Sequence, residues 1–332
     1  MKNNLFVNYN IDAGNITMEK NIKKILQNSF DHYNFIPYKN KRNLINKAIS
    51  SIHLRKTLKK YNKSNKIIFN SIGPATWGYG SYNINNAILM LDWTRSFEDF
   101  AYEKKIKKDI IHFFQSYILK KIPKILCRTN KIMKNLSDCY GVKYSQMKKI
   151  PAPLDVELFN IPPRPTPLKP RVLFIGNDFD RKGGFFLINH LDQILEKFEL
   201  TIVSSDKKGD ISGINYIDNL LYGSLSHKKI FYNHDVLILP SRIEPYGMVI
   251  AEAASAGLAI ITTKYAFASA DLIQNEFSGI VTENQIQCVE ALLNLANNQS
   301  LIDIFKSNIY KSIHKNFSRY KLEKIYMNIL TN

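Results

Sequence analysis

The sequence has few cysteines, and they form no recognisable pattern. Among its 332 residues are three cysteines, Cys127, Cys139 and Cys288, and no C-x-x-C pair occurs. An odd number at such wide spacings excludes a disulfide framework and a zinc knuckle. We therefore expect buried, reduced thiols in a cytoplasmic protein.

Long apolar runs are also missing. The longest, residues 248–261, is interrupted by Glu252 and falls short of the roughly 20 residues that a membrane-spanning helix needs. The N-terminal residues lack the apolar core and the cleavage site of a signal peptide, so we expect none. These absences predict a protein that is soluble or, at most, peripheral on a membrane.

Two further absences limit the chemistry. No G-x-G-x-x-G motif follows a predicted strand, which argues against a nicotinamide-dependent enzyme. No cluster of histidine, cysteine and aspartate indicates a metal site, so we expect neither a metal nor another cofactor.

Acidic residues are scarce in one half of the chain only. Residues 1–170 contain 30 Lys and Arg against 11 Asp and Glu, a difference of +19. Residues 171–332 contain 16 against 17, a difference of −1. A lysine-rich genome would raise the lysine content of both halves. The first half is therefore selectively basic, which predicts an anionic partner there.

Prolines mark a boundary between two domains. Seven of the twelve prolines fall between residues 151 and 170. Because proline lacks an amide donor and disfavours helix before it, this stretch predicts an extended linker. At roughly 100–200 residues per domain, the length also predicts two domains, which we place at residues 1–165 and 166–317.

Both halves alternate strands with helices, more clearly in the second half. Such alternation predicts an α/β fold with two Rossmann-like domains, each a parallel sheet that binds ligands at the carboxyl ends of its strands. The predicted strands are residues 5–10, 66–70, 87–91, 124–129, 171–176, 199–205, 215–221, 235–241, 258–263 and 279–283. The predicted helices are residues 17–29, 41–61, 97–121, 130–140, 184–197, 226–233, 248–256, 285–297 and 318–330.

The most informative local pattern is SRIEPYGMVIAEAASAG, residues 241–257. A loop with Glu244 follows a predicted strand, and a helix with Glu252 begins after Gly247. Glycine lets a ligand approach the backbone, and the free amides of Gly247, Met248 and Val249 can bind oxygen atoms. Each carboxylate can accept hydrogen bonds from two adjacent sugar hydroxyls, so one of the two can hold a hexose and the other a ribose. The alternative is that both glutamates are solvated, but Glu252 lies in an otherwise apolar helix.

A second pattern, IGNDFDRKGG, covers residues 175–184. Arg181 and Lys182 precede Gly183 and Gly184, which open a predicted helix. Two cations next to such backbone amides can hold a diphosphate. An ordinary surface turn is the alternative, although the glutamate motif at the same sheet edge favours the diphosphate site.

Residues 171–283 resemble the donor-binding half of a retaining glycosyltransferase of the GT-B fold, family 4. The resemblance is carried by EPYGMVIAE, by KGG after the first strand and by the strand DVLILPS. It extends more weakly upstream through residues 129–159, so that it covers about residues 125–300 in all. It implies two domains facing across a cleft, and a C-terminal helix, residues 318–332, that crosses back to the first domain.

The resemblance also implies roles for individual residues. Glu244 and the amides after it would hold the donor sugar, next to Tyr246. Glu252 would hold the ribose, and Lys182 would hold the diphosphate. Relatives often carry arginine where this chain has Asn177, and by the resemblance Arg181 would supply that missing charge. Asp178 and Asp180 form an Asp-x-Asp sequence, which is the metal-binding motif of a different glycosyltransferase fold. We reject a metal site here because the cations of the same loop already do what a metal would do for the diphosphate.

The first half offers weaker candidates. Gly14 lies in the predicted loop after the first strand, together with Asp12 and Thr17, and in relatives such a loop closes over the donor phosphates. A plain turn is the alternative. Asp92 and Thr94 follow a strand and are similar to an acceptor-side Asp-x-Thr. Asp92 could orient or deprotonate the acceptor hydroxyl, or could cap a helix.

Two basic amphipathic segments, residues 41–60 and 102–121, stand out in the first half. They predict solvated helix faces, a surface for an anionic membrane or a site for an anionic acceptor. Their apolar sides would contain Leu44, Ile45, Ala48, Ile52 and Leu58 in one segment, and Ile106, Ile110, Phe113, Phe114 and Tyr117 in the other.

Together these patterns predict a glycosyltransferase that uses a nucleotide-sugar donor and a glycan or lipid-linked acceptor, with retention of configuration. We expect it in the cytoplasm, either free or on the inner face of the membrane. Two alternatives remain open. One is a nucleic-acid-binding protein, which the high pI suggests, but it would need stacking aromatics or a helix-turn-helix that we do not find. The other is a sugar-nucleotide epimerase of the same fold.

Overall fold

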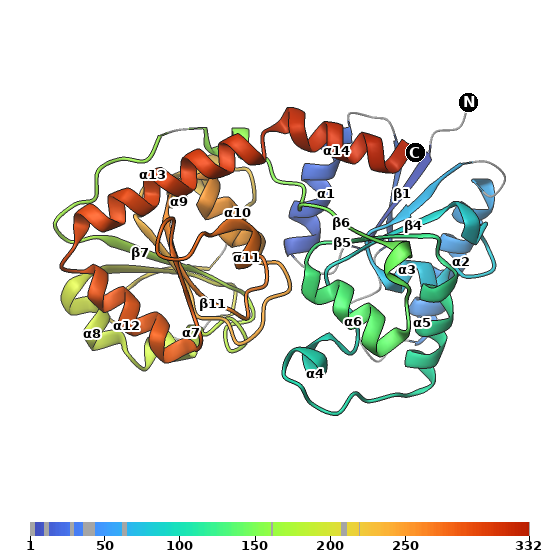
Figure 1. Cartoon of the computed structure of the whole chain (residues 1–332), viewed down its shortest axis with the longest axis horizontal. Coiled ribbons are helices and arrows are strands. Elements are labelled where there is room, and N and C mark those ends of the chain that lie inside the picture. The colour runs from blue at the N-terminus through green and yellow to red at the C-terminus, as the bar shows by residue number, and fades with distance from the viewer. Residues whose placement is uncertain are drawn as a thin grey trace. The chain divides into compact units, whose positions relative to one another are not determined.

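The computed structural model describes residues 4–9, 13–26, 30–35, 44–61, 65–160, 162–206, 211–218 and 220–331. Of residues 13–15, 44–48 and 331 it describes the backbone only. The chain forms two compact units (Figure 1). The first comprises Met1–Pro153 and Leu322–Asn332, and the second comprises Leu154–Lys321. The chain therefore passes from one unit to the other within the proline-rich stretch.

The first unit contains a parallel sheet of six strands in the order β2-β1-β3-β4-β5-β6. Its central strands are apolar throughout, as expected for strands that helices cover on both faces. The strands are β1 (Asn4–Tyr9), β2 (Phe30–Phe35), β3 (Ile67–Phe69), β4 (Ala87–Leu91), β5 (Lys124–Cys127) and β6 (Met147–Lys149). The helices are α1 (Ala13–Leu26), α2 (Leu44–Lys60), α3 (Ile72–Trp77), α4 (Phe97–Ala101), α5 (Ile110–Lys121) and α6 (Asn130–Tyr140).

The second unit contains another parallel sheet of six strands, in the order β12-β11-β10-β7-β8-β9. The strands are β7 (Arg171–Ile175), β8 (Glu199–Val203), β9 (Asn215–Ile217), β10 (Val236–Leu239), β11 (Ala259–Thr263) and β12 (Ile280–Thr282). The helices are α7 (Gly184–Ile188), α8 (Leu191–Lys197), α9 (Leu225–Tyr232), α10 (Met248–Ser255), α11 (Ser269–Leu272), α12 (Gln285–Leu295) and α13 (Gln299–Asn316). The last helix, α14 (Arg319–Thr331), belongs to the first unit from Leu322 onward. Two such sheets confirm the predicted α/β class with two Rossmann-like domains.

Several predicted elements differ from those observed. The predicted helix over residues 97–121 is wrong, because α4 ends at Ala101 and α5 begins only at Ile110. Asp109 starts the second helix: its Oδ1 accepts a hydrogen bond from the amide of His112 at 2.9 Å. The predicted helix over residues 184–197 is likewise divided, into α7 and α8. Strands β2 and β6 and helices α3, α11 and α13 were not predicted.

The last helix, α14, is held to the first unit by a buried arginine. Arg128 donates a hydrogen bond to the carbonyl of Pro151 at 2.8 Å and another to the hydroxyl of Tyr326. That hydroxyl in turn donates to the Pro151 carbonyl at 2.8 Å. Arg128 also contacts the sulfur of Met18 in α1, and Figure 1 shows α14 beside α1. These contacts hold together α1, residues 128–151 and α14, which are distant in the sequence.

A comparable buried cation organises the second unit. Lys306 in α13 donates to the carbonyl of Arg164 at 2.6 Å and to Oδ1 of Asp235 at 3.0 Å. Asp235 directly precedes β10 and also accepts from the amide of Arg171 at 2.9 Å. The pair of Lys306 and Asp235 thus holds α13 and the linker against the first residues of β7 and β10. Both charges are buried, so either one without its partner would destabilise the fold.

The Arg128 network predicts the effect of removing one hydroxyl. We expect Tyr326→Phe to lower the free energy of unfolding of the first unit by about 1–3 kcal/mol, because a buried guanidinium loses a partner. Tyr320→Phe, in the same helix but exposed, should change it by less than about 0.5 kcal/mol. Urea unfolding followed by circular dichroism measures both, and equal stability of the two variants would contradict the assignment.

Candidate functional site

The two motifs of the second half leave the sheet from neighbouring strands. The Arg181-Lys182 loop follows β7, and the Glu244 loop follows β10. These strands pair in parallel, with Val172 opposite Val236, so their carboxyl ends lie at one edge. They are also the strands at which the order of the sheet reverses. Open α/β sheets bind ligands at this position.

Two glycines bring the loops together. Gly183 has φ +87°, and a Cβ atom there would lie 2.2 Å from the carbonyl oxygen of Pro240 at the end of β10. A Cβ atom at Gly176 would lie 2.6 Å from Cδ of Lys182. The first glycine therefore permits close backbone approach between the loops, and the second leaves space for the Lys182 side chain.

The Glu244 loop is fixed on both sides by backbone hydrogen bonds. The amide of Glu244 donates to the carbonyl of Tyr265 at 2.9 Å, and its carbonyl accepts from the amide of Phe267 at 3.0 Å. The loop is thus attached to the segment after β11. This attachment turns the Glu244 side chain toward the Arg181-Lys182 loop.

Glu244, Lys182 and Arg181 form an ion cluster in which the carboxylate is buried and the two cations are partly exposed. Oε2 of Glu244 lies 3.3 Å from Nζ of Lys182 and 3.3 Å from a terminal nitrogen of Arg181. Burial alone would raise the pKa of the Glu244 carboxyl, but the charges of Lys182 and Arg181 outweigh burial and hold the pKa below its usual value of 4.5. The carboxylate is therefore ionised at neutral pH, and two cations meet at one point.

The two cations are not equally constrained. Arg181 also donates to Oδ2 of Asp178 at 2.7 Å and to the carbonyl of Ile243 at 2.8 Å. Asp180 pairs with Arg242. Both aspartates of the Asp-x-Asp sequence thus face arginines. Arg181 is tied to the loop, whereas Lys182 has a flexible ammonium better able to exchange partners.

Asn177 holds the same loop in another way. Its Oδ1 accepts a hydrogen bond from the amide of Ser205 at 3.1 Å. The Asn177 side chain thus fixes the backbone after β8.

Helix α10 begins beside the ion cluster. Gly247 has φ +75° and precedes Met248, the first residue of the helix. The amides at the start of a helix have no partner within it, so those of Met248 and Val249 are available to a ligand. Tyr246 is buried and positions this turn.

Glu252 has a partner that the sequence patterns did not identify. The carboxylate is almost fully buried in α10, and its Oε2 lies 3.6 Å from Nε2 of His227 in α9. His227 is packed against the rings of Tyr222, Phe159 and Phe231. The prediction that Glu252 does not face solvent is therefore supported. His227 was missed because a single histidine in a short helix carries no spacing signal.

The candidates of the first half occupy the carboxyl edge of their own sheet. Gly14 lies in the first turn of α1, not in the loop where we predicted it. Thr17 is buried in α1, and Asp12 is outside the described residues. Asp92 directly follows β4 and is half-buried. Thr94 is fully buried and donates to Oδ1 of Asn135 at 2.6 Å, which is a structural contact.

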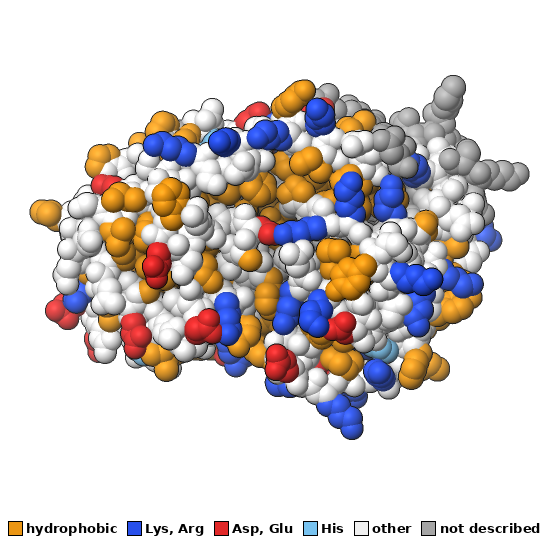
Figure 2. Space-filling model, viewed as in Figure 1, with side chains coloured by type: hydrophobic (Ala, Val, Ile, Leu, Met, Phe, Trp, Pro, Cys, Tyr) orange, Lys and Arg blue, Asp and Glu red, His pale blue; other side chains and the backbone are white. Residues whose placement is uncertain are grey.

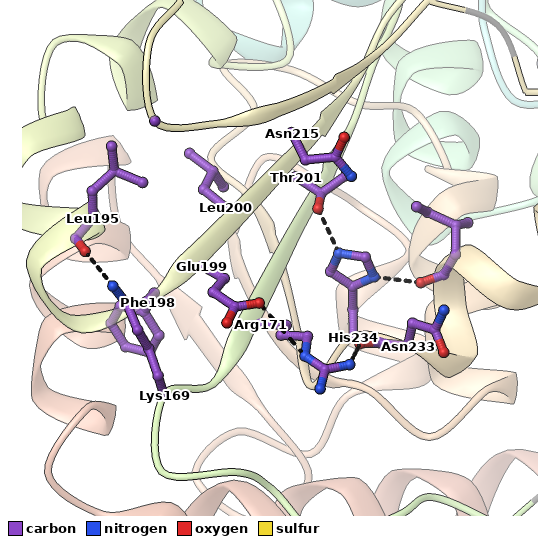
Figure 3. A pocket seen from close by; sticks show the side chains of 12 residues that line it. Lys169, Arg171, Leu195, Phe198, Glu199, Leu200, Thr201, Asn215, Asn233 and His234 are labelled. Carbon is purple, nitrogen blue, oxygen red and sulfur yellow. Dashed lines mark hydrogen bonds and ion pairs between the residues drawn. The ribbon is translucent and has the colours of Figure 1, made fainter.

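A cavity of about 680 Å³ opens at the other edge of the second sheet (Figure 3). Arg171, Glu199 and Asn215, the first residues of β7, β8 and β9, line it. Its cations are engaged: Lys169 donates to the carbonyl of Leu195, and Arg171 donates to the carbonyl of Asn233. None of the predicted site residues lines it.

Within the residues that the structure describes, no group of three or more His, Cys, Asp and Glu side chains is placed to hold a metal ion. No helix in the same ranges is both long and apolar enough to cross a bilayer.

Comparison with known proteins agrees with this geometry. Residues 169–298 match the family model of glycosyl transferases group 1. The matched residues all lie within the second unit. An uncharacterized glycosyltransferase of Methanocaldococcus jannaschii is 28% identical over 123 residues, 33% of this chain. That match spans 30% of the archaeal protein.

Solved structures extend the likeness from the second unit to both units. WaaG, a glycosyltransferase involved in lipopolysaccharide biosynthesis, has a TM-score of 0.74 at 16% identity, with 99% of each chain covered. HepE of Anabaena, in complex with UDP and glucose, has a TM-score of 0.76 at 14% identity, with 100% of each chain covered. Sucrose-phosphate synthase of Thermosynechococcus elongatus has a TM-score of 0.76 at 13% identity, also over 100% of each chain. These likenesses confirm the GT-B fold.

The contact between Gly183 and Pro240 predicts an unequal effect of two glycine substitutions. Gly223→Ala, at φ +81° in open space, should cost only the roughly 1–2 kcal/mol of a left-handed alanine. Gly183→Ala has a similar φ but also meets the Pro240 carbonyl, so we expect a clearly larger loss of stability. Thermal unfolding measures both, and equal losses would refute the close approach of the loops.

The lowered pKa of Glu244 predicts how stability depends on pH. Because the folded state favours the ionised carboxylate, this stabilisation is complete above the unfolded pKa of about 4.5 and is lost as the pH falls through the lower folded pKa. Wild type should therefore exceed Glu244→Gln in urea stability at pH 7, and the difference should shrink below pH 4.5. A difference that stays constant from pH 7 to 3 would contradict the ion cluster.

Proposed function

We propose that the chain is a retaining, family 4 glycosyltransferase. It moves a hexose from a nucleotide sugar to a hydroxyl of a glycan or lipid-linked acceptor, in the synthesis of a cell-surface polysaccharide or glycolipid. The observation that carries this proposal is the ion cluster of Glu244, Lys182 and Arg181 at the switch point of a glycosyl transferases group 1 domain.

The donor is a nucleotide sugar whose diphosphate binds Lys182. Without donor, this ammonium is 3.3 Å from Glu244, a partner with a single charge. A diphosphate carries more charge and more acceptor oxygens, so it can replace the carboxylate as the partner of Lys182. Glu244 and the first amides of α10 are then free to bind the sugar hydroxyls. HepE was crystallised with UDP and with UDP-glucose, which makes a uridine donor the first to test.

Lys182, assisted by Arg181, stabilises the diphosphate as the glycosidic bond breaks. Negative charge develops on the leaving group in the transition state, and cations already in place lower the barrier. These two cations do what a metal ion does elsewhere for a leaving diphosphate, so the proposed reaction uses no metal and no other cofactor. Glu252 holds the ribose and fixes the nucleotide.

The first unit receives the acceptor. Asp92, at the carboxyl end of β4, orients the acceptor hydroxyl, and the Gly14 turn approaches the donor phosphates. The basic surplus of this unit suits an anionic or lipid-linked acceptor. It also suits a cytoplasmic enzyme that works at the inner face of the membrane rather than on nucleic acid.

Nucleotide binding tests the site without knowledge of the acceptor. In a thermal-shift and calorimetric series with UDP and GDP, we expect Glu252→Ala to abolish binding of the preferred nucleotide. Lys182→Ala should weaken its binding at least tenfold, since a diphosphate loses a charge-assisted hydrogen bond. Lys229→Ala, an exposed lysine of α9, is the matched control and should bind as wild type does. Unchanged binding in both site variants would place the nucleotide elsewhere.

Turnover separates the transferase from an epimerase of the same fold. With a labelled sugar nucleotide and a membrane extract as the source of acceptor, label should move into glycan or lipid and free nucleoside diphosphate should accumulate. A free, epimerised sugar nucleotide as the product would overturn the transferase proposal.

A further inference from the structure

Helix α5 has apolar side chains on two opposite sides. On one side Ile118 and Leu119 are fully buried, and the ring of His112 stacks on Tyr140 of α6 at 4.5 Å. On the other side a stripe at helical spacing faces solvent. Ile110 is 84% exposed and Phe113 62% exposed, and the stripe continues through Phe114 and Tyr117, both exposed.

The exposed side is an organised surface. The ring of Tyr79, after α3, meets Phe114 and Tyr117 edge to face at 6.0 and 5.9 Å. Ile111 and Trp77 are exposed too. The predicted apolar side of this segment is thus not part of the core. Contiguous exposed patches of large apolar side chains mark interaction sites, whereas single exposed residues do not.

Lysines surround the apolar stripe. Exposed lysines lie in the connection before α5 and in its last turn: Lys104, Lys105, Lys107, Lys108, Lys120 and Lys121. The ammonium of Lys121 lies over the Tyr117 ring at 4.4 Å. The nearby Asp109 is occupied by the helix start and by Arg95. Over α5, at the lower right of Figures 1 and 2, basic and hydrophobic side chains lie together, and acidic ones are more frequent over the second unit.

We propose that the exposed side of α5 docks on an anionic lipid bilayer. Ile110, Phe113, Phe114 and Tyr117 enter the boundary between headgroups and acyl chains, and the six lysines bind anionic headgroups. Such a combination is characteristic of helices that lie in the plane of the interface. Positive charge around the apolar stripe matches the negative surface of the cytoplasmic leaflet.

The apolar stripe decides between the partners that the sequence left open. A soluble anionic acceptor would use the lysines but would leave Ile110 and Phe113 in water. A bilayer uses both groups of side chains at once. The inference rests on this surface alone and would hold for any enzyme carried by the chain, so its failure would leave the transferase proposal intact.

Vesicle binding by the full-length protein tests the inference. Wild type should co-sediment with vesicles containing 30% phosphatidylglycerol in phosphatidylcholine and should bind pure phosphatidylcholine at least tenfold more weakly. The double variant Ile110→Asn, Phe113→Ser should bind the anionic vesicles at least tenfold more weakly than wild type. The triple variant Lys105→Glu, Lys107→Glu, Lys108→Glu should lose at least as much.

Matched controls distinguish docking from general adsorption. Leu168→Ser with Leu225→Ser removes two leucines that are 94% and 74% exposed in the second unit. Lys229→Glu with Lys311→Glu and Lys315→Glu makes the same change of charge away from α5. Both controls should bind within twofold of wild type. Charge controls that lose as much as the α5 triple variant, or an apolar variant that binds normally, would overturn the proposal.

A second copy of the chain is the competing occupant of this face. Light scattering of the wild type and of the Ile110→Asn, Phe113→Ser variant should show the same molar mass. A Phe113→Trp variant should show a blue-shifted emission with anionic vesicles, and brominated lipid should quench it. A wild-type dimer that the double variant dissociates, without a lipid-dependent shift at position 113, would identify the face as a dimer interface and refute lipid docking.

Discussion

The loops at the carboxyl edge of the second sheet depend on one buried carboxylate shared by two cations. Glu244 can be buried only because Lys182 and Arg181 come from the neighbouring loop. Those side chains can reach it only because Gly183 lets the loop touch the end of β10. The ion cluster, the glycine and the strand order are therefore parts of a single constraint. The same constraint concentrates positive charge where the leaving group of a sugar nucleotide would develop negative charge.

Each unit uses a buried cation to fix its architecture. Arg128 in the first unit and Lys306 in the second bind carbonyls, a hydroxyl and a carboxylate inside the protein. They hold segments in place and are unavailable to ligands. The lysines around α5 are exposed, and Lys182 is in an exchangeable pair. The cations that hold the fold are therefore different residues from those that the two proposals assign to the donor and to a membrane surface.

The sequence was sufficient for the features that follow from local patterns. Apolar runs predicted the strands of the second sheet, and glycine after a strand predicted both loops of the donor site. It was insufficient where a contact joins distant segments. The pairing of Glu244 with Lys182 and that of His227 with Glu252 depend on how loops and helices meet in space. Strand β2, FDHYNF, was not predicted because its polar residues interrupt the apolar pattern. The helix predicted over residues 97–121 was too long because Asp109 was not recognised as the N-cap of α5.

A crystal structure with UDP bound tests the central claim most directly. The account predicts the terminal phosphate within hydrogen-bond distance of Nζ of Lys182, the ribose on Glu252, and Glu244 released from its cation partners. A nucleotide in the cavity at the opposite edge of the second sheet, with the pairs of Glu244 unchanged, would contradict it.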